Sequence, residues 1–247
     1  MPTNPRPTEA EDSPIQAVVF DWGGTLSTFV AAELADAWRL AARHIAPDRE
    51  EELTAQLVAV EAAFWQTTST TQRSGTLADL LAAATRALHL DVAEVLLEEA
   101  AVVHLDAWTP LVRHDPDAVP TIAELRGRGL RIGMLSNTHW PRHFHERFLA
   151  RDGLAELIET RRYTSEMSFQ KPHASAFHAV LRDLDVDDAG RAVFVGDRPW
   201  DDIHGAKSVG MRAVLRRNPE VPGHDVEPDA VIERLPELPA VVDRLGA

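Results

Sequence analysis

Ala17-Val18-Val19-Phe20-Asp21-Trp22-Gly23-Gly24-Thr25-Leu26 is the stretch that decides the fold of this chain. Its first four residues are apolar, which is typical of a short strand buried on both faces of a sheet. Asp21 follows at the carboxyl end of that strand, the edge where open α/β sheets bind ligands. Gly23 and Gly24 allow the backbone to approach a ligand closely. A carboxylate in this position is poorly suited to stability, so the stretch predicts a functional site as well as a strand.

Composition excludes several classes of function. The 247 residues include no cysteine, which rules out disulfides, thiolate nucleophiles and zinc–thiolate sites. The net charge of −14 argues against sequence-independent binding of nucleic acid, which needs clustered cations. No apolar run approaches the roughly 18 residues that cross a bilayer, and residues 1–14 lack the pattern of a signal peptide. We therefore expect a cytoplasmic protein without a nucleic-acid or membrane partner, and a disordered leader over residues 1–14.

Four further short apolar runs have the character of buried strands, and helical stretches lie between them. Each run is bounded by Gly, Asp, Asn or Pro, as expected in a parallel sheet. Alternating strands and helices imply right-handed crossovers, so the pattern predicts an α/β sandwich. The runs are 131–135, 192–195, 212–215 and 230–232, and the helical stretches include 118–128, 173–184 and 202–209.

Residues 30–109 interrupt this alternation, because they contain no strand signal. They are rich in Ala, Leu and Glu, with apolar residues at helical spacing. Pro47, Gly75 and Asp91 are expected helix boundaries. We therefore predict an α/β fold with a Rossmann-like, three-layer core formed by residues 15–29 and 110–247. A bundle of about four helices, residues 30–109, is inserted after the first strand.

Four separated stretches carry groups suited to binding phosphate or a metal ion. They are Asp21 to Thr25, Ser136-Asn137-Thr138 after the second strand, Lys171-Pro172 ahead of a helix, and Gly196-Asp197 with Asp202 five residues later. A carboxylate attacks phosphorus only when the negative charge of the phosphate is offset. Hydroxyl and backbone N–H groups of the second stretch, together with Lys171, are suited to hold the phosphoryl oxygens. Carboxylates supply the hard oxygen ligands that Mg²⁺ prefers.

In order and spacing, these stretches resemble the four motifs of the haloacid dehalogenase-like hydrolase superfamily. The resemblance covers the chain from about residue 15 to 245, and the helical insertion matches the position of that family's cap domain. It implies a Mg²⁺-dependent hydrolase of a small phosphorylated substrate, in which Asp21 is the nucleophile that forms an aspartyl-phosphate. The implied catalytic residues are Asp21, Ser136 and Lys171, the implied phosphate-binding residues are Gly24, Thr25, Ser136, Asn137 and Lys171, and the implied metal ligands are Asp21, the Gly23 carbonyl, Asp197 and Asp202.

Gly23 departs from the pattern of the family's phosphatases. Those enzymes usually have a second aspartate two residues after the nucleophile, where it protonates the leaving group and later activates water. Gly23 has a carbonyl for a metal ion but no side chain to supply a proton. Either the substrate has a good leaving group or the acid comes from elsewhere, for which His139 and His173 are the candidates.

Three alternative functions follow from the same departure. A phosphonatase-like enzyme also has a small residue here, but it uses a lysine of the cap, and residues 30–109 contain none. A dehalogenase in the strict sense needs no metal and usually lacks the acidic pair, which Asp197 and Asp202 supply here. A catalytically impaired binding or regulatory protein is the third alternative, although the motif residues are all retained. The sequence does not indicate the identity of the substrate or the oligomeric state.

The six tryptophans fall into two groups. Trp22, Trp140 and Trp200 each lie beside a motif, and the sequence leaves open whether they pack in a core or form an aromatic wall around the substrate entrance. Trp38, Trp65 and Trp108 are expected in the core of the helical insertion, together with Phe64.

Overall fold

A computed structural model describes residues 15–28 and 34–247 of the chain. The expected leader over residues 1–14 lies outside the described residues, as does the segment 29–33. Within the described part, no helix is both long and apolar enough to cross a membrane.

The centre of the molecule is a six-stranded, wholly parallel sheet in the order β3-β2-β1-β4-β5-β6. The first strand lies near the middle, with Phe20 opposite Met134 on one side and Val195 on the other. This central position explains why all four of its residues are fully buried. The strands are β1 (Ala17–Phe20), β2 (Arg131–Ser136), β3 (Thr160–Tyr163), β4 (Ala192–Gly196), β5 (Arg212–Arg216) and β6 (Ala230–Ile232).

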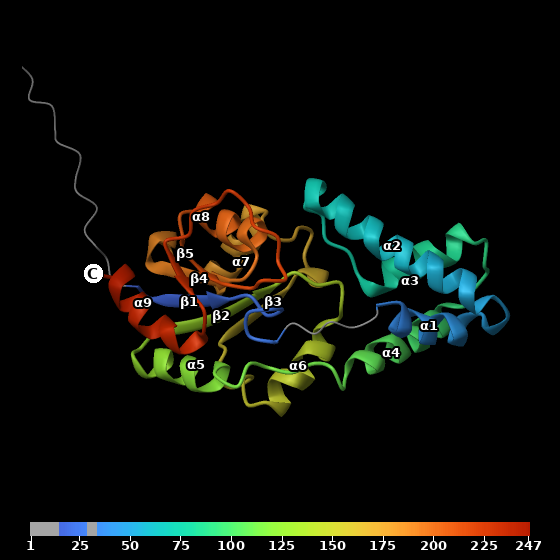
Figure 1. Cartoon of the computed structure of the whole chain (residues 1–247), viewed down its shortest axis with the longest axis horizontal. Helices are drawn as coiled ribbons and strands as arrows, with labels where there is room; N and C mark the ends of the chain where they lie inside the picture. The colour runs from blue at the N-terminus through green and yellow to red at the C-terminus, as the bar shows by residue number, and fades with distance from the viewer. Residues whose placement is uncertain (1–14, 29–33) are drawn as a thin grey trace, which may run out of the picture.

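Helices cover both faces of the sheet, so the predicted three-layer α/β core is confirmed (Figure 1). Side chains alternate between the two faces of a strand. Val18 and Phe20 therefore join one apolar cluster, whereas Ala17 and Val19 join the other. The first cluster includes residues of α5 (Ala118–Gly127), α6 (Arg142–Arg151) and α9 (Leu238–Leu245). The second includes residues of α7 (Ala174–Asp183) and α8 (Gly205–Ser208), which a π-helix at Pro199–His204 precedes.

Residues 34–108 form four helices beside the sheet, which we call the helical segment (Figure 1). They are α1 (Leu34–Ile45), α2 (Glu50–Thr71), α3 (Leu77–Ala87) and α4 (Glu94–Trp108). The expected boundary residues Pro47, Gly75 and Asp91 all lie between these helices. Fully buried Trp38 and Leu57 contribute to their common core. Thr76 begins α3 with a capping box in which its hydroxyl accepts from the Asp79 N–H.

Three elements of the core were not named from the sequence: α6, α9 and the edge strand β3. The strand reads Thr-Arg-Arg-Tyr and has no apolar run to indicate it. Its arginines are tied to carboxylates of neighbouring helices, Arg161 to Glu146 and Arg162 to Asp183. Edge strands often carry charges, which oppose pairing with other chains. The pairing of β3 with β2 is therefore a tertiary property that the local sequence does not reveal.

Candidate functional site

The four chemistry-bearing stretches meet at the carboxyl edge of the sheet. Asp21 follows β1, and its backbone N–H donates to the carbonyl of Val195 at 2.9 Å. Ser136 is the last residue of β2, and Asp197 follows β4. Because β1 lies between β2 and β4, the strand order alone brings these three side chains to one place.

Lys171 bridges two of the carboxylates. Its Nζ donates to Asp21 Oδ1 at 2.6 Å and to Asp202 Oδ1 at 2.7 Å. The lysine is 1% exposed and Asp202 is fully buried, so water screens these ion pairs poorly. The second oxygen of Asp202 accepts from the backbone N–H of Arg198 at 2.9 Å. The arrangement holds a buried cation directly against the predicted nucleophile.

Asn137 holds Lys171 through its backbone. The amide nitrogen of Asn137 donates to the Lys171 carbonyl, and the amide oxygen accepts from the Lys171 N–H, both at 2.9 Å. The side chain of this expected phosphate-binding residue is therefore engaged in positioning the lysine. The Lys171-Pro172 peptide bond is cis.

Three buried carboxylates are arranged in a way that suits a metal ion. Asp21, Asp197 and Asp202 each offer an oxygen, and these atoms lie within 4.8 Å of one another. Gly24 has a positive φ of 85°, and a Cβ built on it would overlap the Asp197 carboxylate. Only glycine fits both requirements. Thr25, which follows Gly24 in the turn after β1, has its Oγ1 3.5 Å from Asp197 Oδ1.

The electrostatics of the site follow from its burial. Burial raises the pKa of Asp21 to about 7, although Lys171 acts to lower it and Asp202 and Asp197 act to raise it. Burial also raises the pKa of Asp197, next to the Asp202 charge. The burial of Lys171 favours its neutral form, but Asp202 and Asp21 outweigh that effect and raise its pKa. The lysine therefore stays charged. Its charge partly offsets the repulsion among the three neighbouring carboxylates.

A cavity of about 430 Å³ opens over these groups and reaches from the sheet edge to the helical segment; we call it the main cavity. Asp21, Ser136, Asn137 and Lys171 line it on the sheet side, and so does Gly23. A smaller side pocket of about 200 Å³ adjoins it and includes Gly24, Leu111 and Val112.

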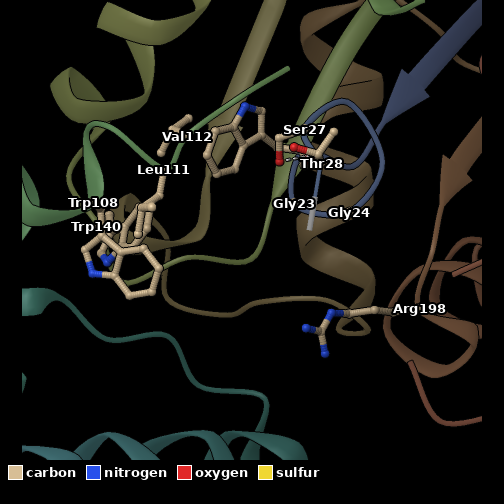
Figure 2. Close-up of a pocket in the computed structure, with 10 residues that line it drawn as sticks. Gly23, Gly24, Ser27, Thr28, Trp108, Leu111, Val112, Trp140 and Arg198 are labelled. Atoms are coloured by element: carbon tan, nitrogen blue, oxygen red, sulfur yellow. Dashed lines mark hydrogen bonds between the residues drawn. The ribbon is translucent and has the colours of Figure 1, made fainter. Parts of the chain in front are cut away.

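Tryptophans and an arginine surround the side pocket (Figure 2). Trp108 and Trp140 lie next to each other with ring centroids 5.4 Å apart. Arg198 extends toward the space in front of them from the opposite side (Figure 2). Its guanidinium makes no hydrogen bond or ion pair with any residue that the structure describes. These three residues also line the main cavity.

The two histidines considered as replacement acids lie in different environments. His139 lines the main cavity and is 5% exposed. Burial lowers its pKa to about 3, so it is neutral near pH 7 and is not a ready source of a proton. His173 instead caps the N-terminus of α7, where its ring accepts from the Ser175 N–H, and it does not line the cavity. The structure thus brings His139 to the site but not His173.

The tryptophans near the motifs divide in the same way. Trp22 and Trp140 line the main cavity, whereas Trp200 is 37% exposed, stacks on His204 and does not line it. Trp38 is fully buried in the helical segment as expected. Trp108 and Phe64 pack against this core as expected, but Trp108 also lines the cavity, and so does the partly exposed Trp65. Large aromatic side chains at helical spacing do not reveal which of them face a ligand.

Sequence reasoning also missed polar residues of the site. Asn218 donates to Asp197 Oδ2 at 2.7 Å and lies just beyond the carboxyl end of β5, so the strand-end position was the available signal. Arg198 directly follows Asp197, a predicted metal ligand, so its position near a strand end was a comparable signal. Glu61, in the middle of α2, lines the main cavity and offered no signal in the sequence.

Comparisons with known proteins agree on one family. A family model described as haloacid dehalogenase-like hydrolase matches residues 15–210. The glyceraldehyde 3-phosphate phosphatase of Methanopyrus kandleri is 30% identical over 65% of this chain and 70% of that protein. The enzyme of the same name from Pyrococcus furiosus is 31% identical over 54% of this chain and 56% of that protein. The chain thus spans between about half and 70% of the length of these relatives.

A solved structure extends the similarity over nearly the whole chain. The 2-haloacid dehalogenase from Pseudomonas syringae pv. Tomato is 27% identical, with a TM-score of 0.69, and the match covers 93% of this chain and 99% of that one. The fold is therefore one that supports more than one hydrolytic chemistry, so the reaction has to be argued from the residues of the site.

Proposed function

The chain belongs to the haloacid dehalogenase-like hydrolase family and is a hydrolase, and we propose that it is a Mg²⁺-dependent phosphatase acting through an aspartyl-phosphate at Asp21. The observation that carries the proposal is the buried network in which Lys171 contacts both Asp21 and Asp202 beneath the main cavity. A cation placed there offsets the charge of a phosphoryl group beside a carboxylate nucleophile.

Each residue of the sheet edge has a role in the proposed reaction. Lys171 and the hydroxyl of Ser136 hold the phosphoryl oxygens, and Asn137 fixes the lysine. Asp21 then attacks phosphorus and the alcohol oxygen leaves, after which water hydrolyses the aspartyl-phosphate. Gly23 supplies no acid, so the reaction is fastest for esters whose leaving group needs little protonation.

The carboxylate cluster fits Mg²⁺ by its donor set. Asp21 and Asp197 would hold the ion, with the Gly23 carbonyl and Asp202 as the remaining protein oxygens. A bound Mg²⁺ would offset the charge of nucleophile and phosphate, and would keep Asp21 ionised against the burial that raises its pKa. Asp202 and Asp197 both act to raise the pKa of Asp21, and a cation bound among the three carboxylates would offset this repulsion.

We assign the helical insertion, residues 30–109, the role of a cap over the core formed by 15–29 and 110–247. Glu61 and Trp65 of α2 and Trp108 of α4 line the main cavity together with Asp21. A cap in this position excludes bulk water from the phosphoryl group and admits only small substrates. The named relatives act on a small phosphorylated metabolite, which supports the same substrate class here.

The experiment is phosphate release from a panel of small phosphate monoesters, in Mg²⁺ and in EDTA. We expect turnover only with Mg²⁺, and recovery when the ion is restored. Acid-quenched enzyme should carry the mass of one phosphoryl group on the peptide that contains Asp21. Turnover in EDTA would contradict the metal requirement, and a phosphoryl group on another residue would contradict the mechanism.

Dehalogenation is the second candidate, because of the likeness to a 2-haloacid dehalogenase. Halide release from 2-chloropropionate in EDTA distinguishes the two reactions. The buried cluster of three carboxylates favours the phosphatase, because displacement of halide from carbon gives such a cluster no role.

A further inference from the structure

Polar atoms without partners gather around the main cavity. In the described part of the chain, seven buried side-chain nitrogen or oxygen atoms lack a hydrogen-bond partner. Five of them belong to residues that line this cavity: both ring nitrogens of His139, the indole nitrogens of Trp108 and Trp140, and Nδ1 of His145. A buried polar atom without a partner costs about 1–3 kcal/mol, so their accumulation at one place indicates a ligand that satisfies them.

His139 is the most incompletely satisfied residue of this group. It lies in the loop that follows β2 and also holds Asn137, three residues after Ser136, and its side chain is buried. Its Nε2 lies 3.6 Å from Glu61 Oε1, which is too long for a hydrogen bond. A neutral imidazole has one donor and one acceptor nitrogen, and here neither is used within the described part.

Glu61 faces His139 from the helical segment and is held in place. The indole nitrogen of Trp38 donates to Glu61 Oε2 at 2.6 Å, and His104 stacks on that indole with ring centroids 3.8 Å apart. Glu61 is itself only 6% exposed. The Trp38 indole therefore fixes Oε2, while Oε1 lies 3.6 Å from His139 Nε2.

Aromatic rings enclose this pair. Trp65 lies with its ring centroid 5.6 Å from that of His139, and Trp140 at 6.1 Å. Indole faces contact the carbon skeleton of a ligand and reduce competition from water for its polar groups.

We propose that Glu61 and His139 together bind a hydroxyl group on the leaving part of the substrate, which makes the substrate the phosphate ester of a small hydroxylated carbon chain. This inference rests on the proposed phosphatase function. The hydroxyl donates to Glu61 Oε1, the oxygen that does not accept from Trp38, and accepts from the N–H of His139, so that His139 gains a partner. Because Glu61 belongs to α2 and His139 to the sheet edge, the same hydroxyl ties the helical segment to the core.

The test compares matched pairs of esters, glycerol 1-phosphate with propyl phosphate and erythritol 4-phosphate with butyl phosphate. We expect kcat/KM to favour the hydroxylated member by at least about tenfold, because a site built for a hydroxyl leaves its own groups unpaired with an analogue that lacks one. In Glu61→Gln, the single side-chain oxygen accepts from the indole nitrogen of Trp38, and the amide nitrogen therefore faces the substrate hydroxyl. The side chain no longer accepts from that hydroxyl, so the preference for the hydroxylated ester should be lost. His139→Phe, which keeps a ring but removes both nitrogens, should also lose it.

Glu51→Gln is the matched control, because Glu51 is an exposed glutamate in the first turn of the same helix. It should retain the wild-type preference. A wild-type preference below about twofold for both pairs, or equal preferences in Glu61→Gln and Glu51→Gln, would overturn the proposal.

Failure of the underlying function gives a different result. If no phosphate monoester, p-nitrophenyl phosphate included, is hydrolysed in Mg²⁺, the phosphatase proposal is wrong, and the subsite is then tested by binding alone. Trp65 and Trp140 lie next to His139, so tryptophan fluorescence can report the binding of each ester. Tighter binding of glycerol 1-phosphate than of propyl phosphate, abolished by Glu61→Gln, supports the subsite; equal binding contradicts it.

Discussion

Two groups of residues in the main cavity differ in how completely their polar atoms are satisfied. In the first, which we call the lysine network, Lys171, Asp21 and Asp202 are joined by short hydrogen bonds, and Asn137 fixes the lysine backbone. In the second, which we call the open group, His139 and the indole nitrogens of Trp108 and Trp140 have no hydrogen-bond partner among the described residues. The lysine network is complete without a ligand, whereas the open group is not.

This difference separates chemistry from recognition. Reacting groups need a fixed geometry before the substrate arrives, since reorganising charges during the reaction adds to the barrier. Groups that select a substrate gain specificity when only the right ligand satisfies them. We therefore expect substitutions in the lysine network to affect every substrate, and substitutions of His139 and of Glu61, which faces it, to affect the choice among substrates.

The largest effect is expected from Asp21→Asn. An amide is not a nucleophile toward phosphorus, so phosphate release should fall by at least about 1000-fold while the fold is kept. Phosphate release from p-nitrophenyl phosphate in Mg²⁺ measures this. Asp201→Asn is the control, because Asp201 adjoins Asp202 in sequence but makes no hydrogen bond to Lys171. Substantial activity in Asp21→Asn would contradict the aspartyl-phosphate mechanism.

Lys171→Met removes the cation that joins Asp21 and Asp202 in the lysine network. The variant leaves Asp21 and Asp202 buried without their partner, which should lower the free energy of unfolding by about 3–5 kcal/mol. Urea unfolding in EDTA measures this loss. Lys207, the other lysine, pairs with Asp229 at the surface, and Lys207→Met should cost at most about 1 kcal/mol. Equal losses in the two variants would show that the buried network contributes no more than a surface pair.

His104→Phe tests the interior of the helical segment. Burial lowers the pKa of His104 from 6.5 to about 4, so the unfolded chain binds the proton more readily than the native protein. Wild-type stability attributable to this group is therefore present above about pH 6.5 and is lost as pH falls toward 4, by about 1.4 kcal/mol per pH unit. Phenylalanine can stack on Trp38 without titrating.

The measurement is urea unfolding of both proteins between pH 7 and pH 4. The variant should gain up to about 3 kcal/mol relative to wild type over this range. The carboxyl groups titrate in both proteins, so the difference between the two curves isolates His104. Parallel curves would contradict the lowered pKa.

Gly23→Asp has the smallest expected effect and tests whether the site lacks a general acid. No atom lies within 4 Å of a Cβ built at Gly23, and Gly23 lines both the main cavity and the side pocket, so there is room for a carboxylic acid. An acid here could protonate a poor leaving group, and kcat for propyl phosphate should rise about tenfold. Gly23→Asn, of similar shape but without a proton to give, should not show the rise. An equal rise for p-nitrophenyl phosphate would argue against general acid catalysis.

Much of the sheet edge could be predicted from local signals. Short apolar runs ending in Asp21, Ser136 and Asp197 indicate buried parallel strands, and parallel strands present their carboxyl ends to one edge. The four-helix insertion was predicted for a similar reason, since apolar periodicity and breaks at Pro47, Gly75 and Asp91 are local. The edge strand β3 was missed because its burial comes from its neighbours and not from its own residues.

Local patterns in the sequence were enough to predict the parallel α/β core, the helical insertion and the groups at the strand ends, because strand burial, helical periodicity and strand polarity are properties of short segments. The positioning of Lys171 by Asn137, the entry of His139 but not His173 into the cavity, and the lining contributed by Trp108 and Glu61 follow from the tertiary structure. Those facts depend on how α2 and α4 pack against the sheet edge. Such packing brings together residues far apart in the chain, so no local sequence pattern predicts it.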